Sequence, residues 1–354
     1  MKWYNPQCAP FQISGFPFYE KEQTYRRLPL GMEGILPDAL CGLADETAGG
    51  QIRFHGKLKD IRIRVSLAAK PGFFDGYKSP HVARTNKSAF DLYLSKDGKD
   101  YVFCSVAKMH ETDRYYEALM LDLQEAEEFD ILLNFPLYGG VDKILIGVDD
   151  DAEISAPQYA FKTDKKIAIY GSSIQQGSSA SRPGMCISNL MSRLLDTEFY
   201  NLGFNSSGKA EPEVAELIAN IPDLSCLLIS VEGNCPDAQW LDEKVRAFLD
   251  IFREKYPTLP VIILPFFTSG QDSLHPWWGD RRKENFVVQK AIVEDRKKAG
   301  DENIYLVRQD DFVPREELGH SVWHECTVDG LHMTDLGFYW IAKGLAQFLK
   351  ELGL

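Results

Sequence analysis

The stretch that decides the fold is "KIAIYGSSIQQGSSASRPGMCISNLMSRLLD", residues 166–196. It opens with an apolar run at 166–171, which has the length of a buried strand and stops at a glycine. Two serines, Ser172 and Ser173, come next, and apolar residues then recur at helical spacing over 184–196. The stretch is therefore predicted to be a strand, a turn and a helix, with hydroxyl groups at the tip of the strand.

The alternation of strand and helix continues to the C-terminus. Two of the later apolar runs, "CLLISV" and "VIILPFF", are uninterrupted, as in strands that are buried on both faces. Further strands are predicted at 197–203, 225–233, 259–267 and 303–308, and further helices at 211–221, 239–256, 281–300 and 334–352. Strand–helix units in series favour a parallel sheet with helices on both faces, so residues 161–354 are predicted to form a flavodoxin-like three-layer α/β domain.

Residues 1–160 have a different pattern. Ile61, Ile63 and Val65 alternate with polar residues, which is typical of a strand with one face in water. "SKDGKD" (95–100) separates two such runs, and its Asp-Gly pair is typical of a hairpin turn with positive φ. Many short strands joined by such turns predict an antiparallel β-sandwich, jelly-roll-like, with 149–157 as the linker to the second domain.

The composition excludes some classes of partner. The net charge is −13 over 354 residues, whereas nucleic acids and anionic lipids both attract proteins with clustered Lys and Arg. The seven cysteines form no C-x-x-C pair, which argues against a disulfide framework and a zinc site. The sequence has neither a signal-peptide pattern nor a run of about 18 apolar residues. We therefore expect a cytoplasmic protein that binds neither membrane nor nucleic acid and needs no cofactor; a homo-oligomer stays open.

Reactive residues in such a sheet are expected at the carboxyl ends of the strands. Ser173 follows the first strand, and Asn234 follows the third. A serine hydroxyl becomes a nucleophile when a base takes its proton and hydrogen-bond donors stabilise the oxyanion that forms. The D-x-x-H pattern of Asp329 and His332 supplies such a base, because the carboxylate can fold back onto Nδ1 and leave Nε2 for the serine. Thr334 is the expected N-cap of the last helix, which fixes where this turn ends.

Each of these motifs has a structural interpretation as well. A glycine followed by two serines is most often a turn and a helix cap, and Asn234 could be a turn residue. Chemistry is favoured because the serine, the asparagine and the D-x-x-H pair all fall at the same edge of the predicted sheet. His320 and His324 precede that pair without a carboxylate at the same spacing, so His332 is the expected base.

Further candidates concern the substrate and a metal. Arg182 lies shortly after the serine pair and either contacts substrate or pairs with a carboxylate of the first domain. Trp277 and Trp278 are expected on a loop after the fourth strand, where their rings either stack on a sugar or an acyl group or pack between the domains. The metal-ligating residue types that stand out in the first domain are His81, His110, Asp75 and Asp113. No pair of them has the spacing of a metal site, so no metal is expected.

Four blocks of the second half resemble the SGNH (GDSL-like) hydrolase superfamily. They are "YGSSIQQG", "NLGFNSSGKAEPEVA", "VEGNCP" and "DGLHMTDLGF". The resemblance implies that Ser173 is the nucleophile and that His332 and Asp329 complete a Ser-His-Asp triad. It further implies an oxyanion hole made by the N–H of Ser173, the N–H of Ser206 and the Asn234 side chain.

The chain departs from the family pattern at two positions. Ser172 stands where the family has the aspartate of its name-giving motif, which organises the turn without belonging to the triad. Ser206 stands where the family has a glycine whose N–H serves the oxyanion hole, and a backbone N–H needs no particular side chain. The chemistry is therefore expected to survive both departures.

The first domain resembles the β-sandwich that precedes one branch of this superfamily. That branch carries a G-x-D-L-Y motif, here "AFDLY" (89–93), and "ASRPG" (180–184) also recurs in it. The resemblance implies a serine esterase that hydrolyses short acyl esters, acetyl above all, on a small molecule or an oligosaccharide. The alternatives are an acyltransferase that uses the same triad with an alcohol acceptor, and an inactive glycan-binding protein.

Overall fold

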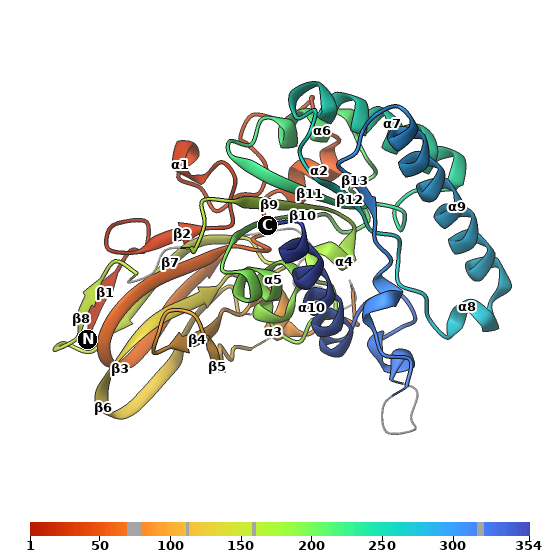
Figure 1. Cartoon of the computed structure of the whole chain (residues 1–354). Coiled ribbons are helices and arrows are strands. Elements are labelled where there is room, and N and C mark those ends of the chain that lie inside the picture. Colours follow the sequence, from red (N-terminus) through yellow and green to blue (C-terminus); the bar gives the residue numbers. More distant parts are fainter. Residues whose placement is uncertain (69–78, 111–112, 158–160, 317–321) are drawn as a thin grey trace.

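The computed structural model describes residues 1–68, 79–110, 113–157, 161–316 and 322–354, so Asp75 and His320 lie outside the described residues. The first half of the chain forms an antiparallel sheet and the second half a parallel sheet (Figure 1). No helix of the described part is long and apolar enough to span a membrane.

The antiparallel sheet is built around two long strands. Its strands are β1 (Lys2–Tyr4), β2 (Gln12–Ser14), β3 (Gln51–Leu67), β4 (Asp91–Ser95), β5 (Val102–Val106), β6 (Tyr115–Asn134), β7 (Val141–Val148) and β8 (Glu153–Ser155). The order is β1-β7-β3-β6-β4-β5, and β2 and β8 also pair with β3. The register of β3 against β6 shifts between Leu58 and Arg62, and such bulges bend strands. The sheet thereby curves around one apolar core, which confirms the antiparallel, sandwich-like prediction.

Three details of this half were open to test. Gly98 has φ 71° between β4 and β5, as the hairpin prediction requires. The linker prediction for 149–157 is wrong in part, because β8 pairs with β3 over His55–Lys57 and satisfies backbone groups there. The alternating residues of 115–123 and of 128–150 form two separate runs in the sequence, whereas β6 continues unbroken from Tyr115 to Asn134.

The parallel sheet has the predicted flavodoxin-like order. Its strands are β9 (Lys166–Gly171), β10 (Glu198–Gly203), β11 (Leu224–Ser230), β12 (Val261–Ile263) and β13 (Ile304–Leu306). They are arranged β10-β9-β11-β12-β13, and every pairing is parallel. In this order the direction of winding reverses between β9 and β11, and ligands bind beyond the carboxyl ends of the strands at such a point.

Helices cover both faces of the parallel sheet (Figure 1). The helices of the second half are α4 (Ser173–Gln176), α5 (Ile187–Leu195), α6 (Pro212–Ala219), α7 (Ala238–Lys255), α8 (Gln271–Leu274), α9 (Pro276–Lys298) and α10 (Asp335–Glu351). The first half adds α1 (Tyr19–Glu22), α2 (Asp38–Leu43) and α3 (Arg84–Ser88). Side chains of α6, α7 and α9 pack on one face of the sheet, and those of α5 and α10 pack on the other.

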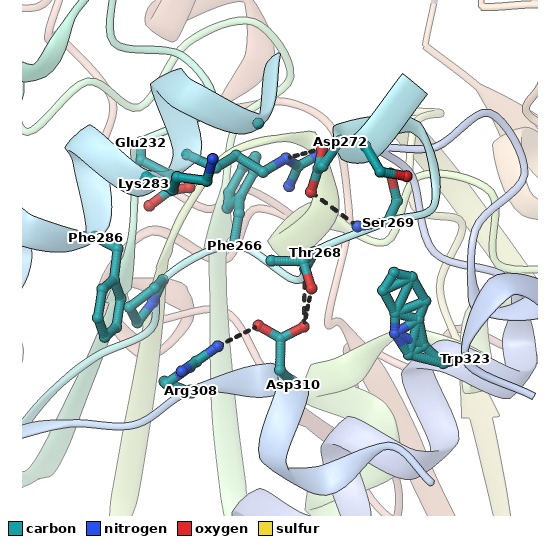
Figure 2. Close-up of a pocket in the computed structure, with 14 residues that line it drawn as sticks. Glu232, Phe266, Thr268, Ser269, Asp272, Lys283, Phe286, Arg308, Asp310 and Trp323 are labelled. Atoms are coloured by element: carbon teal, nitrogen blue, oxygen red, sulfur yellow. Dashed lines mark hydrogen bonds and ion pairs between the residues drawn. The ribbon is translucent and has the colours of Figure 1, made fainter. Parts of the chain in front are cut away.

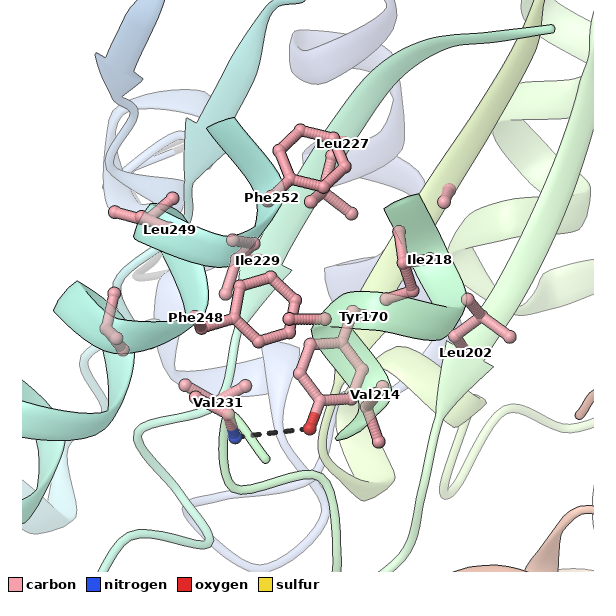
Figure 3. Close-up of a cluster of buried hydrophobic side chains, with 14 of the residues drawn as sticks. Tyr170, Leu202, Val214, Ile218, Leu227, Ile229, Val231, Phe248, Leu249 and Phe252 are labelled. Atoms are coloured by element: carbon pink, nitrogen blue, oxygen red, sulfur yellow. Dashed lines mark hydrogen bonds between the residues drawn. The ribbon is translucent and has the colours of Figure 1, made fainter. Parts of the chain in front are cut away.

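The core under α6 and α7 is shown in Figure 3. Tyr170 of β9 stacks on Phe248 of α7, with ring centroids 5.3 Å apart and planes 6° apart. Leu28, Leu36 and Leu40 of the first half pack into the same core, the last of them from α2. The N-terminal segment therefore supplies part of a helical layer of the second half, while the division of the chain at residue 160 stays a prediction.

One helix boundary differs in a way that concerns the site. The predicted helix 281–300 begins five residues earlier, at Pro276, whose fixed φ suits the first position of a helix. Trp277 and Trp278 therefore lie in the first turn of α9, and their prediction as loop residues is wrong. Their rings stack on each other, with centroids 4.4 Å apart.

Candidate active site

The turn after β9 separates the roles of the two serines. Ser172 caps α4: its Oγ accepts the Ile174 N–H at 3.3 Å, and the Gln175 side chain accepts the Ser172 N–H at 3.1 Å. Ser173 is the first residue of α4 and faces a cavity, with 8% of its surface exposed. Gly171 leaves no room for a side chain, because a Cβ would lie 2.3 Å from the Ser230 carbonyl oxygen. The strand ends on glycine because β11 packs against that point.

A hydrogen-bonded chain leads from this serine to a carboxylate. Ser173 Oγ lies 3.0 Å from His332 Nε2, and His332 Nδ1 lies 2.8 Å from Asp329 Oδ2. The second oxygen of Asp329 accepts the backbone N–H groups of Leu331 and His332 at 3.0 and 2.8 Å. Burial raises the pKa of the Asp329 carboxyl, but these hydrogen bonds and the imidazole outweigh burial and hold the pKa below its usual range. An ionised Asp329 favours the tautomer with a proton on Nδ1, which leaves the Nε2 lone pair facing the serine.

The loop that carries this pair is fixed from three sides. Thr334 caps α10 by accepting the Gly337 N–H at 3.4 Å, as predicted. Gln271 of α8 donates to the Asp329 carbonyl at 2.9 Å, and Arg282 of α9 donates to the Gly330 carbonyl at 3.2 Å. The two bracing side chains, Gln271 and Arg282, were not among the candidates, because nothing in their local sequence indicates a contact with the D-x-x-H turn.

Backbone N–H groups are available near the serine. Within the described part of the chain, neither the N–H of Ser173 nor that of Ser206 has a hydrogen-bond acceptor. Ser206 has φ 55°, a conformation that usually favours glycine, and it lines the same cavity as Ser173. Asn234 lines that cavity too, but its amide nitrogen donates to the 204–208 turn: to Ser207 O by a short contact, and at 3.3 and 3.4 Å to the carbonyls of residues 204 and 208.

The cavity around the serine has a volume of about 340 Å³ and draws residues from both halves of the chain. The first half contributes His81, whose ring stacks on His332 with centroids 4.4 Å and planes 20° apart. Its Nε2 lies 3.3 Å from Ser178 Oγ. Burial, and then the neighbouring His332, lower the pKa of His81, so it is neutral where a free histidine would begin to protonate. The sequence singled out His81 only as a metal-ligand type, and its place beside His332 had no sequence signal.

Among the described residues, one group that includes His81 and His332 could hold a metal ion. Ligand atoms of His81, Asp329 and His332 lie within 4.8 Å of one another. Both nitrogens of His332 already have partners, so an ion would have to replace the contacts to Ser173 and Asp329. The arrangement fits proton transfer without such a replacement, and the expectation of no metal stays a prediction.

The first half also holds the segment that follows the serine helix. Asp91, the acid of "AFDLY", is fully buried and accepts the Gly184 N–H and the Asn134 side-chain amide, each at 2.7 Å. Burial raises the pKa of Asp91 to about 6, although these two hydrogen bonds oppose the rise. Asn86 of α3 donates to the carbonyls of Gly177 and Ala180, both at 2.8 Å. The "AFDLY" and "ASRPG" stretches are therefore two sides of one contact.

The predicted substrate residues lie at different distances from the cavity. Arg182 does not line it; the guanidinium lies over the Phe103 ring at 3.9 Å and 3.8 Å from the Asp91 carboxylate. Trp278 lines a small recess next to the cavity, whereas Trp277 is 60% exposed and lines neither. Arg182 thus pairs with a carboxylate of the first half, which was the alternative to substrate contact. Of the two predicted tryptophans, Trp278 is the one that lies next to the cavity.

Comparison with known families places this geometry. The model of the GDSL-like lipase/acylhydrolase family matches residues 164–350, more than half of the chain. The chain belongs to this family. A second family model, for the N-terminus of SGNH-hydrolase-type esterases and named after its GxDLY motif, matches residues 1–154. This GDSL-like protein is accordingly an SGNH-type carboxylic ester hydrolase with the accessory N-terminal region of one branch.

Solved structures extend the likeness along the whole chain. A protein assigned as a GDSL-like lipase from Bacteroides ovatus is 29% identical, with a TM-score of 0.87, over 99% of this chain and 97% of that one. A salicylyl-acyltransferase from a tetracycline biosynthetic pathway is 16% identical with a TM-score of 0.74, over 100% and 98%. A family two carbohydrate esterase from Cellvibrio japonicus is 10% identical with a TM-score of 0.60, over 99% and 97%. The last two share the fold. No curated protein sequence matches the chain.

Proposed function

We propose that this GDSL-like protein hydrolyses short acyl esters, acetyl esters above all, by a Ser-His-Asp mechanism, and that the alcohol part of the substrate is a carbohydrate. The observation that carries the proposal is the continuous contact from Ser173 Oγ through both nitrogens of His332 to Asp329, at 3.0 and 2.8 Å. These are the distances at which a base can take the proton of an attacking hydroxyl.

The reaction follows from those contacts. Ser173 Oγ attacks the ester carbonyl carbon while His332 Nε2 takes the hydroxyl proton. The tetrahedral intermediate collapses, His332 returns the proton to the leaving alcohol oxygen, and an acyl-serine remains. Water then attacks the acyl-serine while His332 takes its proton, and His332 passes that proton to Ser173 Oγ as the acid is released. Asp329 stays ionised throughout and stabilises the imidazolium that forms in each half-reaction.

The oxyanion of each intermediate meets the N–H groups of Ser173 and Ser206 and the amide of Asn234. The last of these needs a local change, because its nitrogen contacts carbonyls of the 204–208 turn. An amide nitrogen has two N–H groups. One can keep the short contact to Ser207 O while the other exchanges the weaker contacts at 3.3 and 3.4 Å for an anionic oxygen.

The support for a carbohydrate substrate comes from proteins that share the fold. Among proteins of this fold are the family two carbohydrate esterase of Cellvibrio japonicus and an acetyl xylan esterase from Butyrivibrio proteoclasticus. An acyl transfer to an alcohol would use the same steps with an acceptor hydroxyl in place of water, so hydrolysis and transfer differ in the second half-reaction alone. The cytoplasmic location and the oligomeric state stay predictions.

The test uses 4-nitrophenyl acetate as substrate. Ser173→Ala is expected to lower kcat at least about 1000-fold, since the nucleophile and its base act as a unit. Ser172→Ala is the matched control, because it removes only a helix cap. It is expected to lose about 1 kcal/mol of stability and to lose far less activity than Ser173→Ala loses. A fluorophosphonate probe should label Ser173 in the parent protein. Near-parent activity of Ser173→Ala would refute the mechanism.

Product analysis separates hydrolysis from transfer. A hydrolase releases acetate in proportion to alcohol whatever acceptor is added. New ester formed with an added alcohol, at the expense of acetate, would replace hydrolysis by acyl transfer as the function. If the probe does not label Ser173 and no ester is turned over, the glycan-binding alternative is favoured.

A further inference from the structure

A second and larger cavity lies on the far side of Phe266 from the serine. It has a volume of about 510 Å³, within the range of small-molecule sites. The residues around it come from the ends of β11 and β12, from α8 and α9, and from the segments at 308–310 and 323. Figure 2 shows Thr268 and Asp310 between Phe286 on one side and Trp323 on the other.

The two cavities are neighbours that share one lining residue. Phe266 lines the cavity around Ser173, the larger cavity, and the small recess between them. Gly233, next to Asn234, makes room for this ring, because a Cβ at Gly233 would lie 2.2 Å from the ring. A ligand with its ester at Ser173 would have to cross Phe266 to enter the larger space.

Each charged side chain around the larger cavity already has a partner. Lys283 pairs with Asp280 at 3.0 Å, and Glu232 accepts a hydrogen bond from Gln289. Arg282 pairs with Asp272 at 2.8 Å, and Arg308 lies 3.4 Å from Asp310. The other oxygen of Asp310 accepts the N–H and hydroxyl of Thr268 at 3.0 and 2.6 Å. A charged ligand would have to break such pairs at a cost in free energy. The cavity is thus suited to a neutral ligand.

Polar groups with no partner point to hydroxyls on that ligand. Ser269 is 4% exposed, and its Oγ has no hydrogen-bond partner in the described part of the chain; the same holds for the indole Nε1 of Trp323. Both residues line the cavity. A buried polar atom without a partner is costly, so a donor–acceptor group from a ligand is favoured there. Phe266, Phe286 and Trp323 supply apolar faces beside these polar atoms.

We propose that this cavity is a subsite for a neutral sugar unit of the substrate, remote from the ester that Ser173 attacks. A sugar ring offers hydroxyls to Ser269 and Trp323 and an apolar C–H face to an aromatic ring. The inference rests on the proposed esterase function and adds that the substrate is an oligosaccharide rather than an acetylated monosaccharide. Occupancy of a remote subsite raises kcat/KM, because binding energy there helps to hold the ester at the nucleophile.

The test fills the cavity. Ser273→Trp places an indole at an exposed position that lines it, and Leu274→Trp places the same indole on the neighbouring, 75% exposed position that does not. The measured quantity is the ratio of kcat/KM on acetylated xylo-oligosaccharides to kcat/KM on 4-nitrophenyl acetate. We expect Ser273→Trp to lower this ratio about tenfold or more and Leu274→Trp to leave it within about twofold. An equal ratio in the two variants overturns the subsite, as does a loss confined to aryl esters of longer acyl chains, which would mean that the cavity holds the acyl group.

A binding measurement separates this inference from the esterase proposal. Calorimetric titration of the parent protein with unacetylated xylohexaose and cellohexaose requires no turnover. Turnover of the aryl acetate without oligosaccharide binding sinks the subsite and leaves the esterase. Binding that Ser273→Trp abolishes, in a protein with no Ser173-dependent turnover, sinks the esterase and leaves the subsite. Should Ser273→Trp fail to fold, Trp323→Ala with Trp240→Ala on α7 as its control takes its place.

Discussion

His81 and His332 stack face to face, with ring centroids 4.4 Å apart, although one belongs to each half of the chain. The contact fixes the plane of the imidazole whose Nε2 meets Ser173. Burial and His332 lower the pKa of His81. At a pH above the ordinary pKa of a histidine, His81 therefore brings no positive charge to the site. The antiparallel half is thus part of the active site's geometry.

This stack predicts that His81→Ala and His81→Phe differ. Alanine removes the ring, frees the His332 side chain to rotate and is expected to lower kcat about tenfold, because misplaced reacting groups cost rate. Phenylalanine keeps the ring without a titratable group and is expected to recover most of that loss. The measurement is kcat and KM on 4-nitrophenyl acetate between pH 5 and 9. Equal losses in the two variants would exclude a positioning role for the stack.

Asn234 is predicted to act on kcat more than on KM. Asn234→Ala removes the proposed oxyanion donor and an anchor of the 204–208 turn, and loss of one oxyanion donor costs about 100- to 1000-fold in kcat. Steady-state kinetics on the aryl acetate, with circular dichroism to confirm folding, checks this. A change in KM with unaltered kcat would mean that the amide holds substrate and not the oxyanion.

Asp91→Ala is predicted to weaken the contact between the two halves and so to lower the stability of the protein. The substitution leaves the buried Gly184 N–H and the Asn134 amide without their acceptor. Each of the two groups costs about 1–3 kcal/mol, so urea unfolding should show a loss of about 2–6 kcal/mol. Asp91→Asn keeps one acceptor oxygen and should lose less. Equal stability of both variants and the parent protein would contradict this tether.

Glu232→Gln is predicted to change how stability depends on pH. Burial raises the pKa of Glu232 to about 7 from 4.5, although the hydrogen bond from Gln289 and the charge of Arg282 oppose it. The folded protein therefore holds this proton more tightly than the unfolded chain, and the group's contribution to stability, full below pH 4.5, is lost as the pH rises to 7.

The glutamine variant lacks that titration. The free energy of unfolding of Glu232→Gln minus that of the parent protein should rise between pH 4.5 and 7.5 by up to about 3 kcal/mol. Urea unfolding at several pH values measures the difference. A difference that stays constant or falls with pH would show that Glu232 does not titrate in this range.

Local patterns in the sequence predicted most of the architecture. Continuous apolar runs and helical spacing predicted all five parallel strands and the longer helices that follow them, but not the four-residue helices α4 and α8. A strand buried on two faces leaves an uninterrupted apolar run, and a helix buried on one face leaves a period. The D-x-x-H pair was predictable for a similar reason: Asp329 and His332 are three residues apart, so a single turn joins them. The start of α9 was missed, since two tryptophans after a proline suit a loop and a helix equally.

Contacts between distant segments left no such trace. His81, Gln271 and Arg282 reach the D-x-x-H turn from other elements, and the cavity behind Phe266 exists because several of those elements meet. By itself the sequence determined the two kinds of sheet, the serine at the strand end and the D-x-x-H pair that the structure places beside it. The tertiary structure alone decided which side chains hold His332 in place and what space lies beyond it, because those depend on how the two sheets and their helices pack, and packing joins residues that have no fixed spacing along the chain.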